Sequence, residues 1–161
     1  IPYESLRKFM LAHGIPLDRL EEGQRHILVV DDDPYYLDII PAALTKDGDY
    51  KVLVASTGFD AGALVVEHNP HLLILDIHLS DMDGRMVAER VKSRPETKTT
   101  RILAISGYLD DEEADALAEY GFDDYIKKPF RIADLCDRVR KLFDMPNAKL
   151  ARPKRLNLPA E

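Results

Sequence analysis

Acidic side chains follow two of the most apolar stretches of this sequence. Asp31, Asp32 and Asp33 come directly after the run "HILVV", and Asp76 closes the run "HLLILD". Two carboxylates about 4 Å apart repel each other by roughly 4 kcal/mol at an effective dielectric constant of about 20. A divalent cation offsets that repulsion, and Mg²⁺ binds carboxylates together with waters and phosphate oxygens. These residues therefore predict a magnesium site, provided that the folded chain brings them together.

A hydroxyl and an amine close two further apolar runs. Ser106 ends the run "RILAIS", and Lys128 ends the run "DDYIKK". In phosphoryl transfer a metal ion and a lysine neutralise developing charge, a hydroxyl donates to a phosphoryl oxygen, and a carboxylate can act as the nucleophile. The combination of acids, hydroxyl and amine is therefore typical of phosphoryl-transfer chemistry.

The runs that carry these residues are interpreted as the strands of a sheet. They span residues 26–30, 51–55, 71–76, 101–106 and 123–128, and apolar residues at helical spacing lie between them. Asp33 before a proline predicts a helix start, whereas Asp47 before a glycine and Asn69 before a proline predict helix ends. Strands alternating with helices predict an α/β domain with a parallel sheet covered on both faces. Ligands bind such sheets beyond the carboxyl ends of the strands, which is where the acids, the hydroxyl and the amine stand.

With these residues at the strand ends, residues 26–144 resemble the receiver domain of a two-component response regulator. The resemblance implies a flavodoxin-like (βα)5 fold, a doubly wound parallel sheet with strand order 2-1-3-4-5. It implies that Asp31 and Asp32 bind Mg²⁺. It also implies that Asp76 in "LILDIHLSDMDG" binds the metal and accepts a phosphoryl group, and that His78 offers its backbone carbonyl to the metal.

The same resemblance gives roles to residues of the last two strands. Ser106 corresponds to the hydroxyl residue of the family and Lys128 in "KKPF" to its lysine, and both are expected to act on the phosphoryl group. Tyr125 corresponds to the switch aromatic, which turns inward when Ser106 moves toward the phosphoryl group. The bond between Lys128 and Pro129 is expected to be cis, as is usual in the family.

A few positions depart from the usual pattern of the family or vary within it. Ser80 stands where a proline is usual, which should loosen the loop after Asp76 without removing a ligand. Ser106 replaces the commoner threonine and keeps the donor. His78 and Tyr108 occupy two variable positions beside the phosphoryl site, and because both are large we expect them to screen the acyl phosphate from water.

The resemblance implies a phosphorylation-dependent signalling switch rather than an enzyme in the usual sense. A histidine kinase or a phosphotransfer protein would present phosphohistidine to Asp76, and the domain would catalyse only its own phosphorylation and slow dephosphorylation. The surface made by the fourth helix, fifth strand and fifth helix of the repeat would then change and control an output, expected to be transcription. The alternative is a single-domain phosphorelay shuttle, or a receiver that docks on a partner without DNA-binding output. A homodimer is left open, and a flavin- or nucleotide-binding enzyme is disfavoured because no glycine-rich loop follows the first run.

Composition bounds the remaining possibilities. The chain has 161 residues, 45% of them apolar, and a net charge of −7, which together favour one globular domain with extra segments and argue against a generic nucleic-acid or membrane binder. The single cysteine, Cys136, excludes an internal disulfide framework and fits a reducing cytoplasm. No apolar run reaches membrane-spanning length and no signal peptide is evident, so we expect a cytoplasmic protein without membrane contact.

The two ends of the chain differ from the central domain. In residues 1–25 the stripe in "YESLRKFMLAH" predicts one helix over residues 3–13, stopped by Gly14 and followed by a linker. This segment resembles the C-terminal helix of an excisionase-type winged-helix DNA-binding domain, which would bring DNA as a partner through an upstream domain. The first residue, Ile1, is compatible with such a fragment. Residues 145–161 are basic and are expected to form a flexible tail.

Other chemistry-bearing residues are better explained by structural roles. Asp33 is interpreted as a helix cap, and "DMDG" at residues 81–84 as a turn and helix start, because a calcium loop in that register would lack its first and last acidic ligands. The 5 histidines lack zinc-ligand spacing. Cys136 falls on the apolar stripe of the last helix, and the acids from Asp110 to Glu113 suit a solvated helix start.

Overall fold

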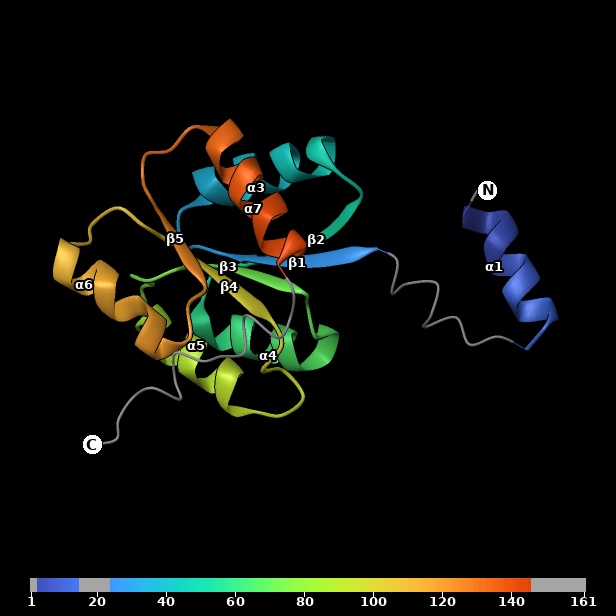
Figure 1. The fold of residues 1–161 in the computed structure, drawn as a ribbon, viewed down its shortest axis with the longest axis horizontal. Helices are drawn as coiled ribbons and strands as arrows, with labels where there is room; N and C mark the ends of the chain where they lie inside the picture. Colours follow the sequence, from blue (N-terminus) through green and yellow to red (C-terminus); the bar gives the residue numbers. More distant parts are fainter. Residues whose placement is uncertain (1–2, 15–23, 146–161) are drawn as a thin grey trace.

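Five parallel strands form one sheet, and helices cover both of its faces (Figure 1). The computed structural model of the chain describes residues 3–14 and 24–145. The strands are β1 (Arg25–Val30), β2 (Tyr50–Ala55), β3 (Leu72–Asp76), β4 (Arg101–Ser106) and β5 (Asp124–Lys127). Their order across the sheet is β2-β1-β3-β4-β5, with every neighbouring pair parallel. The predicted flavodoxin-like fold and strand order are therefore confirmed.

The helices of the repeat lie in two layers on either side of the sheet (Figure 1). One layer contains α3 (Pro34–Asp47) and α7 (Ile132–Asp144), and the other contains α4 (Gly58–His68) and α5 (Gly84–Ser93). The short helix α6 (Asp111–Ala116) continues into a 3-10 turn over Leu117–Tyr120, whose first residue packs into the same core as α4 and α5. Strands and helices alternate from β1 to α7, as the spacing of the apolar runs predicts.

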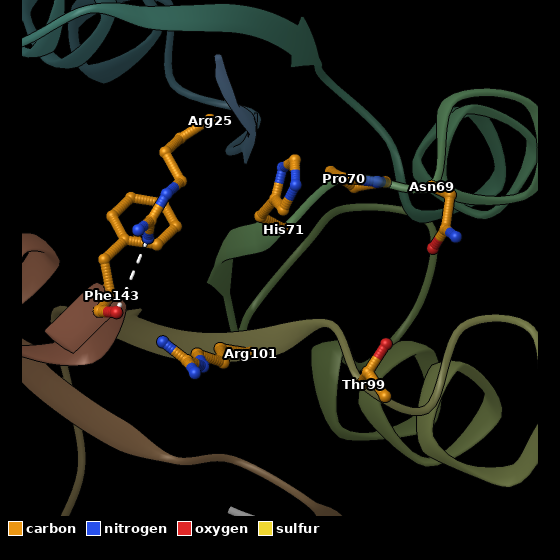
Figure 2. A pocket seen from close by; sticks show the side chains of 7 residues that line it. All are labelled: Arg25, Asn69, Pro70, His71, Thr99, Arg101 and Phe143. Atoms are coloured by element: carbon orange, nitrogen blue, oxygen red, sulfur yellow. Dashed lines mark hydrogen bonds between the residues drawn. The ribbon is translucent and has the colours of Figure 1, made fainter. Parts of the chain in front are cut away.

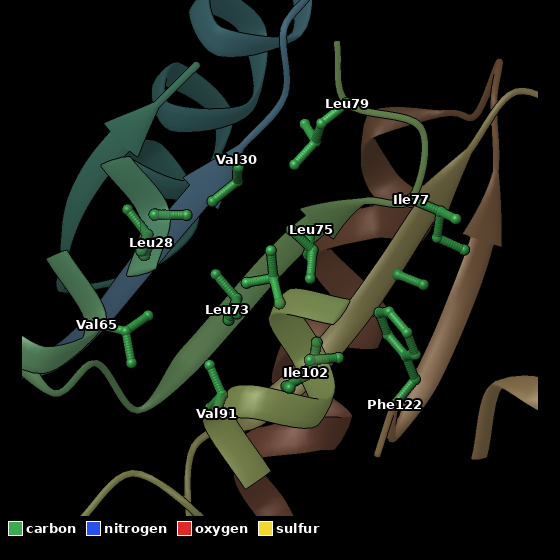
Figure 3. Packing of buried hydrophobic residues seen from close by; sticks show 14 of the residues in the cluster. Leu28, Val30, Val65, Leu73, Leu75, Ile77, Leu79, Val91, Ile102 and Phe122 are labelled. Atoms are coloured by element: carbon green, nitrogen blue, oxygen red, sulfur yellow. The ribbon is translucent and has the colours of Figure 1, made fainter. Parts of the chain in front are cut away.

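Neighbouring residues along each central strand face opposite layers, which gives the sheet two cores. On β1, Leu28 and Val30 belong to one buried cluster, whereas Ile27 and Val29 belong to the other. Figure 3 shows the first cluster, in which the sheet packs against α4 and α5. Because both faces are covered, the strands are continuously apolar rather than alternately apolar and polar. The packed sheet thereby fixes the positions of the residues that follow its strands.

Local signals set the helix boundaries. Asp33 caps α3 by accepting a hydrogen bond from a backbone N–H of the first turn at 2.9 Å, and Asn69 ends α4 with a left-handed φ of 44°. Asp110 and Glu113 form a reciprocal capping box at the start of α6. Cys136 lies on α7 and is buried in the core. The structural roles predicted for these residues are confirmed.

The predicted N-terminal helix is also present. Helix α1 (Tyr3–Ala12) ends one residue earlier than predicted, and Gly14 has the left-handed φ of 69° expected at a helix stop. Arg25, which the sequence places in the linker, is the first residue of β1. The rest of the predicted linker, apart from Gln24, and the tail beyond Met145 lie outside the described residues. Within the described ranges, no helix combines the length and the apolar character needed to cross a membrane.

Candidate functional site

The carboxyl edge of the sheet gathers three carboxylates and one ammonium group. Asp31 and Asp32 follow β1, Asp76 ends β3, and Lys128 follows β5. Each carboxylate offers an oxygen, and these oxygens lie within 4.8 Å of one another. Asp31 is completely buried and Asp76 nearly so, whereas Asp32 is exposed to solvent. The structure thus brings these four residues together at one edge.

Lys128 binds to both buried carboxylates. Its Nζ lies 2.7 Å from Oδ2 of Asp31 and 3.2 Å from Oδ2 of Asp76. The ammonium also lies 4.3 Å from the centre of the Tyr36 ring, which is a cation–π contact. Burial alone would lower the pKa of Lys128, but the hydrogen bonds and charges of the two carboxylates raise it above its usual value. Lys128 is therefore held in its charged form between the two acids.

Asp76 is subject to opposing electrostatic influences. Its Oδ1 accepts a hydrogen bond from the His78 backbone N–H at 3.0 Å, and its Oδ2 accepts one from Lys128. Burial, together with the charge of Asp31, raises the pKa of Asp76 and outweighs both hydrogen bonds. A carboxylate whose charge is poorly stabilised binds a cation or an electrophile more readily. Asp76 is thus a buried carboxylate whose charge is only partly compensated at this edge.

The loop between β3 and α5 folds tightly beside the site. The Gly84 N–H donates to the Ile77 carbonyl at 2.7 Å, and a Cβ at Gly84 would lie 2.5 Å from the Asp76 carbonyl oxygen, so only glycine fits there. The Asp81 carboxylate accepts hydrogen bonds from the first two N–H groups of α4, at 2.9 and 3.1 Å, and these bonds lower its pKa. Asp83 caps α5. The predicted turn and helix start are confirmed, and Asp81 additionally ties the loop to α4.

Ser106 is fully buried at the end of β4, and its hydroxyl is bonded to the loop that follows. Its Oγ donates to the Tyr108 carbonyl at 3.0 Å and accepts from the Tyr108 N–H at 3.2 Å. The same carbonyl lies 3.1 Å from Nε2 of His78. Ser106 stands on the strand next to Asp76, but its hydroxyl is turned toward Tyr108. Contact with a group on Asp76 would require Ser106 to exchange partners.

The remaining predicted residues lie on or just after β5. Tyr125 is half-buried and packs against the cluster shown in Figure 3. The peptide bond between Lys128 and Pro129 is cis, as predicted. The register of β4 and β5 pairs Ala104 with Tyr125, so Tyr125 lies on the strand next to the one that carries Ser106.

No sequence signal indicates two further side chains at this edge. Tyr36 lies on α3, with its ring beside the Lys128 ammonium and 5.6 Å from the Phe130 ring. In the sequence it is one aromatic residue among several near the start of a helix, and its partners are more than ninety residues away. Asp81 is expected from sequence to serve its own turn, whereas it caps a helix that precedes it in the chain. Both contacts depend on how distant segments pack.

The arrangement suits a divalent cation. Among the described residues, the candidate ligands at this edge are all oxygens, and three carboxylates face the one Lys128 ammonium, which leaves negative charge uncompensated. Hard cations such as Mg²⁺ prefer this donor set. A buried carboxylate beside a cation, a lysine and a nearby hydroxyl can accept an electrophilic phosphoryl group. The edge therefore has the composition of a phosphoryl-acceptor site.

Comparisons with known proteins point to one family. The model of the response regulator receiver domain matches residues 27–140. An uncharacterised 14.6 kDa protein of Leptolyngbya boryana is 36% identical over 119 residues, which cover 74% of this chain and 90% of that protein. The DNA-binding dual master transcriptional regulator RpaA of Synechocystis is 33% identical over 117 residues, which cover 73% of this chain and 48% of RpaA. The chain thus spans about half the length of that regulator.

A solved structure agrees with these matches. The receiver domain of a DNA-binding response regulator from Colwellia psychrerythraea is similar with a TM-score of 0.71 and 28% identity, covering 76% of this chain and 100% of that one. This chain belongs to the response regulator receiver domain family. Receiver domains are signalling domains of two-component systems rather than enzymes in the usual sense.

Proposed function

We propose that this chain is a phosphorylation-dependent switch that accepts a phosphoryl group on Asp76 from a histidine kinase or a phosphotransfer protein. The observation that carries the proposal is the setting of Asp76. Its carboxylate is buried at a strand end, 3.2 Å from the Lys128 ammonium and clustered with Asp31 and Asp32. Membership of the receiver family supports the same role.

In the proposed reaction an oxygen of Asp76 forms a bond to phosphorus while the bond from phosphorus to the imidazole nitrogen of the donor breaks. The electron pair of that bond stays with the imidazole, which takes up a proton from solvent. The Lys128 ammonium exchanges its contact with the Asp76 carboxylate for one with the phosphoryl oxygens. The Ser106 hydroxyl donates a hydrogen bond to one of these oxygens. Each of these roles uses a group already at, or one strand from, the acceptor.

We assign Mg²⁺ as the cofactor of the carboxylate cluster. Asp31, Asp32 and Asp76 would hold it together with the backbone carbonyl of His78, and it would neutralise charge on the phosphoryl oxygens. The excess of carboxylates over ammonium groups at this edge supports the assignment.

Phosphorylation would act on the rest of the domain through Ser106 and Tyr125. The phosphoryl group carries about two negative charges at neutral pH and replaces the single charge of the Asp76 carboxylate. We propose that Ser106 leaves the Tyr108 carbonyl for a phosphoryl oxygen and that Tyr125 turns inward to fill the vacated space. The surface formed by α6, β5 and α7 would change shape, as a two-state element whose balance is set by local charge.

The output that we propose is control of transcription from the cytoplasm. RpaA is named as a DNA-binding regulator, and its receiver-like part makes up about half of it. DNA would then be reached through an upstream domain, and phosphorylation could act through a homodimer. The alternative is a single-domain phosphorelay shuttle or docking receiver. It is favoured by the Leptolyngbya boryana protein, 90% of which is matched by this chain. Finding a winged-helix domain encoded upstream of Ile1 would favour transcriptional control over the shuttle or docking receiver.

The test is the intact mass of the full chain after incubation with acetyl phosphate and Mg²⁺. We expect one phosphoryl adduct that requires Mg²⁺ and is absent from Asp76→Asn. Asp81→Asn changes a neighbouring acid of the same loop and should be labelled like the wild type. Failure to label under conditions that modify a known receiver, or labelling that persists in Asp76→Asn, would overturn the proposal.

A further inference from the structure

A pocket lies at the amino ends of the strands, at the edge of the sheet opposite the acidic cluster. Its volume is about 380 Å³. Figure 2 shows its polar lining, made by Arg25, Asn69, His71, Thr99 and Arg101, with the Phe143 ring beside Arg25 at one side. Arg25 and Arg101 are the first residues of β1 and β4, and His71 directly precedes β3. Parallel strands bring their first residues together, so two guanidiniums and one imidazole converge at one edge.

The C-terminal end of α7 positions both arginines. The guanidinium of Arg25 lies over the Phe143 ring, 4.7 Å from its centre, and donates to the Phe143 carbonyl at 3.5 Å. The guanidinium of Arg101 donates to the carbonyls of Leu142 and Met145. Cations suit the negative end of a helix dipole. The carbonyls of Leu142, Phe143 and Met145 thus help to hold the two guanidiniums at this end of the sheet.

His71 adds a directed N–H donor to the pocket. Its Nδ1 lies 2.9 Å from the backbone N of His26 and accepts that N–H, so the neutral ring carries its hydrogen on Nε2. Partial desolvation and the neighbouring charges of His26, Arg25 and Arg101 lower the pKa of His71. A lowered histidine pKa is the response expected in a positive potential.

Acidic residues do not neutralise this potential within the lining. Of the described residues that line the pocket, none is acidic. Asp123 acts on Arg101 through its charge, but its carboxylate lies 3.2 Å from the Lys92 ammonium and accepts the Ile102 N–H at 2.8 Å. The described lining therefore carries two guanidiniums and no carboxylate, in a chain whose net charge is −7.

We infer that this pocket binds an anion of the phosphate class, either inorganic phosphate or the phosphate group of a small phosphoester. The Arg25 guanidinium, the His71 imidazole N–H and the Thr99 hydroxyl offer more donors than the two oxygens of a carboxylate can use. A phosphate group offers three or four acceptor oxygens and pairs well with arginine. The pocket volume falls in the range of small-ligand sites, roughly 300–1,000 Å³, so an organic group attached to the phosphate can be accommodated. The inference is independent of the proposed function, because it uses none of the residues at the acidic edge.

The test is a titration of the full chain with inorganic phosphate, and separately with adenosine monophosphate, followed by NMR of the histidine side chains. EDTA removes divalent cations, so that phosphate is not retained through a metal at the acidic edge. Sodium chloride at matched ionic strength separates binding from charge screening. We expect saturable shifts of the His71 signals and a rise in the His71 pKa, because a bound anion favours the imidazolium.

Arg25→Gln is the informative variant, because Arg25 is exposed and its loss does not open the core. We expect phosphate binding to weaken about 10-fold, which corresponds to about 1.4 kcal/mol. Arg90→Gln on α5 makes the same charge change away from the pocket and should bind like the wild type. Thr99→Val removes one neutral donor at an exposed position and should weaken binding by a smaller factor.

Two results would overturn the inference. One is an equal effect of phosphate and chloride on His71, which would mean an adventitious ion only. The other is undiminished binding by Arg25→Gln. Tighter binding of adenosine monophosphate than of phosphate supports a phosphoester site, whereas the reverse order supports a free-anion site.

Discussion

The two edges of this sheet carry opposite charges and stabilise them differently. At the carboxyl edge, Asp31 and Asp76 are buried and share the ammonium of Lys128. At the amino edge, Arg25 and Arg101 bind backbone carbonyls at the end of α7. A side-chain ammonium thus stabilises the acidic edge, whereas backbone carbonyl dipoles contact the guanidiniums of the basic edge.

The difference predicts how each edge responds when charge is added or removed. The Lys128 ammonium contacts both carboxylates, so a change at Asp76 must also alter the ion pair between Lys128 and Asp31. Carbonyl groups keep their dipole whatever occupies the pocket, so the basic edge can take up an anion without losing its supports. Removing one partner should therefore disturb the acidic edge strongly and the basic edge weakly.

The largest effect is expected when Lys128 is removed. Lys128→Met leaves Asp31 and Asp76 facing each other without their shared cation, and loss of one partner from a buried ion pair costs about 3 kcal/mol. We expect the free energy of unfolding, measured with urea and EDTA, to fall by about that amount. Added Mg²⁺ should recover part of the loss, because the carboxylates then regain a cation.

Lys127→Met is the matched control for this change. Lys127 is the exposed neighbour of Lys128, so the same substitution there should leave the free energy of unfolding nearly unchanged. A wild-type unfolding curve for Lys128→Met would show that the two buried acids do not depend on this ammonium.

A smaller effect is expected at the ring that faces Lys128. Tyr36→Leu removes the cation–π contact, which is worth about 1 kcal/mol at a partly buried site, while it keeps an apolar side chain on α3. We expect phosphorylation by acetyl phosphate to slow about fivefold. Tyr36→Phe keeps the ring and should react at nearly the wild-type rate. Equal slowing in both variants would assign the effect to the hydroxyl rather than to the ring.

The exposed side of the acidic edge gives a third prediction, which concerns only the lifetime of the phosphorylated state. His78 Nε2 lies 3.1 Å from the Tyr108 carbonyl, which places a histidine and a tyrosine side by side next to the acceptor loop. If they screen the acyl phosphate from water, the variant with His78→Ala and Tyr108→Ala should lose the adduct severalfold faster. Intact mass followed over time after removal of the donor measures the rate of adduct loss. An unchanged rate would contradict a screening role of His78 and Tyr108.

The sequence is sufficient to predict the sheet and its carboxyl edge, because both follow from signals read along the chain. Apolar runs mark the strands, and the residue after each run is carried to a known edge once the strands are parallel. This reasoning places Asp31, Asp76 and Lys128 at the carboxyl edge. The same reasoning applied to the first residues of the runs indicates part of the basic edge, since His71 and Arg101 begin two of them, whereas Arg25 precedes the run at residues 26–30.

The contacts that the sequence does not predict are those made between segments that are distant in the chain. The approach of Tyr36 to Lys128 depends on how α3 lies against β5, and the bond from Asp81 to the start of α4 depends on the path of a loop. The turn of the Ser106 hydroxyl toward Tyr108 is a choice between rotamers. Such details are decided by packing, which local patterns do not encode.

The smallest effect is expected at the basic edge, from the titration of His71. Its folded-state pKa lies below the ordinary value of 6.5 because of desolvation and the charges of His26, Arg25 and Arg101. The unfolded chain therefore takes up this proton at a higher pH than the folded chain. The contribution to stability is present above the ordinary value and is lost as the pH falls through 6.5 toward the folded-state pKa.

His71→Asn tests this reasoning, because an asparagine oxygen can accept the His26 N–H in place of Nδ1 without titrating. In urea unfolding the variant should gain on the wild type as the pH falls from about 7.5 to about 5.5. Added phosphate should flatten the slope of the wild type, because an anion in the pocket stabilises the protonated ring. A wild-type slope that phosphate does not alter would mean that the two edges differ only in structure and that the basic edge holds no ligand.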